Sequence, residues 1–203
     1  MSTPNSRKHL MPIVAQILSQ MSGLSGPQRK VLLHLMSLWP CIRGRFNFLN
    51  LCRYSSSCER TLRRHFAQSF DWGAFNAAWS GLAVPAHHTL LLALDASFLP
   101  KSGRQTPGLS WFYNGCAARA EKGLELSLLA AIDLHRNTAY ALHAKQTLPT
   151  STSECQDLQH LRESRPNWPA HVRHLVADGA YTRRPRRRGV CKLGLEMVGK
   201  LRR

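Results

Sequence analysis

The sequence predicts an α/β fold in two parts: a helical amino-terminal region, residues 1–82, and a domain built on a mixed β-sheet, residues 88–203. The first part repeats apolar residues at helical spacing, whereas the second contains continuous apolar runs of strand length. The segment between them, residues 81–88, carries a glycine and a proline that break regular structure. Of the 203 residues, 43% are hydrophobic, which is enough to bury a core.

Three helices are predicted before residue 55. Residues 10–21 form a mildly apolar helix that has neither the cleavage pattern of a signal peptide nor the length to cross a bilayer. Pro27 occupies a position where a helix can begin, and the apolar face that follows ends at Pro40. That face consists of Val31, Leu32, Leu35, Met36, Leu38 and Trp39. Residues 45–54 are the third helix.

The pattern of residues 55–66 predicts a helix with a capped amino end. Ser56 followed three residues later by Glu59 is the capping-box arrangement, in which each side chain satisfies a free backbone N–H. Behind this cap, Leu62, Phe66 and Phe70 recur at steps of four and form an apolar stripe.

The other face of this helix carries Arg60, Arg63 and Arg64. A helix, a short serine-containing turn and a second helix with outward arginines match a helix-turn-helix, whose second helix enters the major groove of double-stranded DNA. An ordinary amphipathic helix with a solvated charged face fits this segment equally well. The net charge of +17, from 28 Lys+Arg against 11 Asp+Glu, favours the DNA-binding interpretation.

The second part predicts five strands and an intervening helix. The strands are residues 89–98, 124–133, 138–148, 172–178 and 195–201, and the helix, residues 154–165, lies between the third and fourth strands. This order is that of a ribonuclease H-like core. In this topology the first and fourth strands are neighbours, and the first strand is buried in the centre of the sheet.

Asp95 and Asp178 each end an apolar run and are each followed by a small residue. Taken singly, each is explained as a turn residue at a strand end. On neighbouring strands they would meet at one edge of the sheet, where two carboxylates repel each other unless a cation lies between them. Oxygen ligands suit Mg²⁺ (or Mn²⁺), and such a site can activate the attacking oxygen in phosphodiester chemistry. We therefore predict that Asp95 and Asp178 are metal ligands and catalytic residues.

Residues 92–108, 123–133 and 174–181 resemble the catalytic domain of bacterial insertion-sequence transposases of the DDE superfamily, the cut-and-paste type. Residues 47–54 and 58–66 resemble the DNA-binding region of that group. The resemblance implies recognition of transposon terminal repeats, Mg²⁺-dependent cleavage and transfer of strands into target DNA, and a possible homo-oligomer on DNA. Asp95 and Asp178 match the first two acids of its triad. Lys101 is a DNA phosphate contact by position and charge, although a solvated loop lysine is the commoner case.

Two departures from the family pattern affect the expected activity. The third acid, a glutamate on a later helix, has no match, because Glu196 lies on a predicted strand and too early. Residues 181–190 replace an expected apolar helix with arginines, Pro185 and Gly189. We therefore expect a truncated, incomplete ribonuclease H-like domain in an inactive or partial product.

Two other functions are compatible with the sequence. The alternative is a non-catalytic DNA-binding protein that competes for transposon ends, and a third possibility is an independent nuclease. The six cysteines form no CxxC pair, which argues against a zinc site and favours a reducing compartment. For a DNA-binding protein of this kind we expect a cytoplasmic, nucleoid-associated location. His87 and His88 lie beside no second cluster with metal spacing in the sequence.

Overall fold

The computed structural model describes residues 4–103, 105–149, 155–179 and 184–199, with side chains from residue 11 onward. It divides into two compact units, Met1–Trp79 and Ser80–Arg203. Each unit is described by itself.

The first unit is helical. Its elements are α1 (Pro4–Gln20), α2 (Gly26–Leu38), the 3-10 turn η1 (Trp39–Cys41), α3 (Phe48–Cys52), α4 (Glu59–Phe66) and the start of α5 (Trp72–Ala83). Ser25 caps α2 by accepting a hydrogen bond from the Gln28 N–H, and Pro27 stands in its first turn, as predicted. One apolar cluster joins α1, α2 and α5 around Ile17 and Leu18, and another joins α2, α3 and α4 around Leu62.

Two local predictions in this unit were wrong. The helix expected over residues 45–54 covers only Phe48–Cys52, because the Asn47 side chain caps it by accepting from the Asn50 N–H at 2.8 Å. The capping box of Ser56 and Glu59 does not form. Cys58 is the residue that precedes α4, and Glu59 pairs with Arg63 instead.

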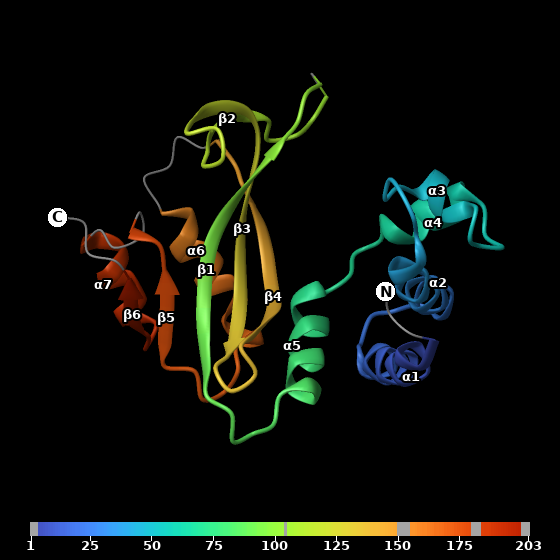
Figure 1. Ribbon diagram of the computed structural model, residues 1–203, viewed down its shortest axis with the longest axis horizontal. Helices are drawn as coiled ribbons and strands as arrows, with labels where there is room; N and C mark the ends of the chain where they lie inside the picture. The colour runs from blue at the N-terminus through green and yellow to red at the C-terminus, as the bar shows by residue number, and fades with distance from the viewer. Residues whose placement is uncertain (1–3, 104, 150–154, 180–183, 200–203) are drawn as a thin grey trace. The chain divides into compact units, whose positions relative to one another are not determined.

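The second unit contains one mixed sheet (Figure 1). Its strands are β1 (Leu90–Pro100), β2 (Ser110–Asn114), β3 (Arg119–Asp133), β4 (Thr138–Thr147), β5 (His174–Ala177) and β6 (Glu196–Gly199). β1 is antiparallel to β3 and parallel to β5, while β3 also pairs with β2 and β4, and β5 is parallel to β6. Figure 1 shows β4, β3, β1, β5 and β6 side by side in this order. The predicted α/β class, the mixed sheet and the central position of the first strand are confirmed.

Helices α6 (Gln156–Ser164) and α7 (Arg184–Lys192) cover one face of this sheet. Leu92 and Leu94 of β1 are 0% and 3% exposed there, together with Leu161 of α6 and Val190 of α7. Alternation along a strand sends successive side chains to opposite faces. The residues of β1 between and beyond these leucines therefore lie on the other face.

The sheet differs from the prediction in three places. β1 does not end at Asp95 but continues beside β3 to Pro100. β2 was not anticipated. The basic segment whose packing the sequence made doubtful is helical from Arg184, and Gly189 leaves room for α7 to lie directly against Leu158.

Candidate functional site

Asp95 and Asp178 each come directly after the last residue pair that joins two neighbouring strands, β1 and β5. The parallel pairing of β1 with β5 ends at Leu94 and Ala177, and the next residues are Asp95 and Asp178. Residues paired across parallel strands place their side chains on the same face. The same register, continued by one residue, would bring Asp95 and Asp178 next to each other on the face opposite α6 and α7.

Both carboxylates are exposed. In the part of the chain that the structure describes, the Asp95 carboxylate has no ion pair or hydrogen bond, and the Asp178 carboxylate accepts a hydrogen bond from the backbone N–H of Gly179. Glu196 lies elsewhere: it pairs with His174 at the amino end of β5, and its carboxylate is 3.4 Å from His174 Nε2. This position agrees with its exclusion as the third acid.

This donor set suits a hard divalent cation. Two carboxylates without cationic partners repel each other at short range, and a bound cation relieves that repulsion. Oxygen-only donors match Mg²⁺ or Mn²⁺ better than softer metals. Asp95 and Asp178, which follow the end of the β1–β5 pairing, therefore fit the metal that the sequence predicted.

A different cluster lies at the amino end of β1. His88, Asp133 and His135 place one ligand atom each within 4.8 Å of one another, the one such group of three found among the described residues. Asp133 is 0% exposed and accepts from His88 Nδ1 at 2.8 Å and from the backbone N–H groups of His135 and Arg136 at 2.9 and 3.2 Å. Burial alone would raise the pKa of Asp133, but these hydrogen bonds outweigh it and lower that pKa.

The sequence missed this cluster because its members come from two distant segments. Its imidazole nitrogens would favour a zinc-like metal over Mg²⁺. However, the hydrogen bonds of Asp133 already close the β3–β4 turn and attach it to His88, two residues before β1. Asp133 therefore has a structural role in the absence of any metal.

The three arginines predicted to contact DNA are all exposed on α4, but they differ in their partners. Arg63 donates to Glu59 Oε1 from Nε at 2.8 Å, and its guanidinium lies 5.1 Å from the centre of the Phe48 ring. Arg60 and Arg64 have no carboxylate partner among the described residues. They are therefore freer to contact phosphate than Arg63.

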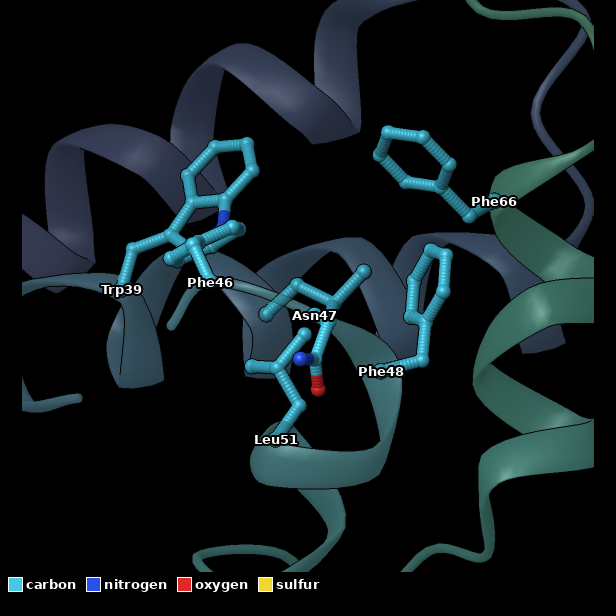
Figure 2. A pocket seen from close by; sticks show the side chains of 7 residues that line it. Trp39, Phe46, Asn47, Phe48, Leu51 and Phe66 are labelled. Carbon is cyan, nitrogen blue, oxygen red and sulfur yellow. The ribbon is translucent and has the colours of Figure 1, made fainter. Parts of the chain in front are cut away.

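A hollow of about 160 Å³ lies between α2, α3 and α4, and its lining is almost entirely apolar (Figure 2). Figure 2 shows Trp39 beside Phe46 and Phe48 beside Phe66, with ring centres 5.5 and 5.3 Å apart. Asn47 is its one polar lining side chain. The hollow carries no group that could act on a phosphodiester, and its aromatic contacts hold α4 against α3.

A second hollow, of about 270 Å³, adjoins this one at Asn47 and is lined by Arg43, Arg45 and Arg53. The loop that forms it has a fixed shape, because Asn50 Nδ2 donates to the carbonyls of Arg43 and Arg45 at 2.9 and 3.0 Å. Gly44 supplies the positive φ of 83° that the turn requires. The sequence did not indicate this loop, because Arg45 and Arg53 fall within the helix predicted over residues 45–54 and Arg43 lies just before it.

Lys101 is exposed in the loop that follows β1. It comes six residues after Asp95, which in an extended strand is about 20 Å. A phosphate contact by Lys101 stays a prediction, and it would involve a different part of the DNA from the part at Asp95.

None of the described helices is long and apolar enough to span a membrane. The six cysteines are free thiols.

Comparison with known proteins gives the family. No curated protein matches the chain. Among solved structures it is similar to the piggyBac transposase in a synaptic complex with hairpin DNA, at 13% sequence identity and a TM-score of 0.49. That match covers 98% of this chain and 49% of the other, so the chain spans about half the length of that transposase. Residues 28–203 match the model of the DDE superfamily endonucleases, and the chain therefore belongs to this family.

Proposed function

We propose that the chain is a DDE transposase protein that binds transposon-end DNA and holds Mg²⁺ or Mn²⁺ between Asp95 and Asp178. The observation that supports this proposal is that Asp95 and Asp178 each directly follow the last residue pair of the β1–β5 pairing, Leu94 and Ala177. Membership of the endonuclease family supports it, and so does the +17 charge.

Each part of the chain has a separate task in this function. Arg60 and Arg64 of α4 contact the DNA, with the loop of Arg43 and Arg45 as a further phosphate contact. Asp95 and Asp178 orient the cation at the scissile phosphate. When bound, that cation supplies charge stabilisation and a more acidic attacking oxygen.

Catalysis by this chain alone is expected to be weak. The family pattern has three acids, and Glu196, the one acid after Asp178, lies at the other end of β5. A site with one anionic ligand fewer holds the cation less tightly and positions it less well. We therefore propose that residues 1–203 bind DNA and metal but transfer strands poorly or not at all.

The proposal is tested with duplexes taken from the DNA that flanks the coding sequence and with shuffled duplexes of the same composition. At fixed salt we expect at least tenfold tighter binding to a flanking duplex. The double variant Arg60→Gln/Arg64→Gln should lose this preference, whereas Arg187→Gln, an exposed arginine of α7, should keep it. Equal binding to flanking and shuffled duplexes would contradict transposon-end recognition.

Metal-dependent nicking of the preferred duplex separates a partial enzyme from a purely DNA-binding competitor. Slow nicking in Mn²⁺ that disappears in Asp95→Asn would support the partial enzyme. Preferred binding without any nicking and without metal binding would favour the competitor.

A further inference from the structure

The arginine-rich run that begins before α7 is the sequence feature that the proposed function leaves unused. In the structure its arginines separate by direction. Arg186 faces α6, and its Nε lies 3.0 Å from both Asp157 Oδ2 and Cys155 Sγ. Arg184, Arg188 and Lys192 are exposed and recur every four residues, so they form one stripe along α7.

This stripe borders an open hollow of about 520 Å³ between α6 and α7. Arg162 and Leu158 of α6 line its other side, and Gly189 lies between the stripe residues. A Cβ at position 189 would come within 2.4 Å of the Leu158 side chain. The glycine therefore lets the two helices approach closely, which places cations from both along one groove.

The carboxylates of α6 are already paired. Asp157 is bound by Arg186, and Glu163 accepts a hydrogen bond from Lys145 Nζ at 2.7 Å. Among the described residues, Arg184, Arg188 and Lys192 have no carboxylate partner. Three uncompensated cations at steps of about 6 Å along a helix form an electrostatic track for a polyanion.

We propose that this groove, lined by Arg184, Arg188 and Lys192, binds the phosphate backbone of double-stranded DNA. The inference rests on the proposed function for the identity of the polyanion. The groove lies on the α6–α7 side of the sheet, whereas alternation along β1 places Asp95 on the opposite face. It therefore holds a stretch of DNA other than the stretch at the aspartates, and its contacts are independent of sequence because they involve phosphate.

The test measures the salt dependence of binding to a fluorescein-labelled duplex of random sequence. Each phosphate contact contributes about 0.9 to the slope of log K against log salt. The variant Arg184→Gln/Arg188→Gln/Lys192→Gln should lower the magnitude of that slope by about 2 to 3 relative to the unmodified chain. All three residues are exposed, so circular dichroism and the Tm should stay unchanged.

The matched control is Arg165→Gln/Arg173→Gln/Arg187→Gln, which removes the same charge from exposed positions outside the groove. A slope that falls equally in the two triple variants would overturn the proposal, because the effect would then come from net charge. In that case, loss of end preference in Arg60→Gln/Arg64→Gln would still support the proposed function. Failure of the unmodified chain to bind any duplex would overturn both.

Discussion

Two places along β1, its amino end and its middle, have acidic residues in opposite situations. At the amino end, Asp133 of the neighbouring β3 is fully buried and accepts hydrogen bonds from His88, His135 and Arg136. At the end of the parallel pairing, Asp95 and Asp178 are exposed and lack cationic partners among the described residues. A carboxylate whose bonds are all used stabilises the fold, whereas carboxylates held close together without partners are available to a ligand.

The largest expected effect is on the buried acid. Asp133→Ala should lower the free energy of unfolding by about 3 kcal/mol, because His88 and two backbone N–H groups lose their acceptor in a dry environment. Asp95→Ala should change it by less than about 0.5 kcal/mol, as expected of an exposed side chain without partners. Urea denaturation of the two variants measures the difference. Equal losses would show that burial and hydrogen bonding do not make Asp133 more important for stability than Asp95.

The next effect concerns pH and a second buried group. His160 is 0% exposed, bonded to Ser127 Oγ at 2.8 Å and to His143 Nδ1 at 2.9 Å, and burial lowers its pKa to about 4. The unfolded chain takes up this proton near pH 6.5, before the folded chain does. Stability should therefore fall between pH 6.5 and 4, on the order of 2 kcal/mol.

Asp133 acts at lower pH. Since its folded pKa is lowered, its contribution is present above the ordinary aspartate pKa and is lost as pH falls through the folded value. Urea denaturation across pH 7 to 3 with His160→Gln measures both steps. A variant that keeps the full loss between pH 6.5 and 4 would remove His160 as its cause.

A smaller effect should follow addition of metal. A cation bound by Asp95 and Asp178 in the folded state stabilises the chain by about 1.4 kcal/mol when its concentration is ten times Kd. The Tm should rise with Mg²⁺ in the unmodified chain and in Glu125→Gln, whose side chain points to the other face of the sheet. It should not rise in Asp178→Asn. An unchanged rise in that variant would assign the cation to another site.

The smallest effect extends the comparison to the arginines of α4. Arg60 has no carboxylate partner among the described residues, whereas Arg63 is tied to Glu59. Arg60→Gln should weaken duplex binding about threefold to fivefold, and Arg63→Gln less than twofold, at one fixed salt concentration. Fluorescence anisotropy measures both. The reverse order would show that the Glu59 pair breaks when DNA binds.

Much of the sheet could be predicted because its signals are local. The apolar run before Asp95 is long enough for a strand buried on both faces, and the strand order places it beside the run before Asp178. The functional difference between acids was not local. Asp133 also ends an apolar run, and only the fold brings His88 to it from 45 residues away.

The helix ends were misjudged for a related reason. Ser56 and Glu59 have the spacing of a capping box, yet Glu59 binds Arg63 one turn later, and Cys58 becomes the residue before the helix. A spacing rule does not reveal which of two partners a side chain takes. The packing of the arginine run was likewise hidden, because only the fold shows that Gly189 of α7 lies close to Leu158 of α6.

Binding of Mn²⁺, followed by the loss of its free electron paramagnetic resonance signal, tests the central claim most directly. If Asp95 and Asp178 hold one cation together, then Asp95→Asn and Asp178→Asn should each abolish the same bound ion, and Glu125→Gln should keep it. Mn²⁺ binding that survives both aspartate variants, or that disappears equally in Glu125→Gln, would contradict a shared site where the pairing of β1 with β5 ends.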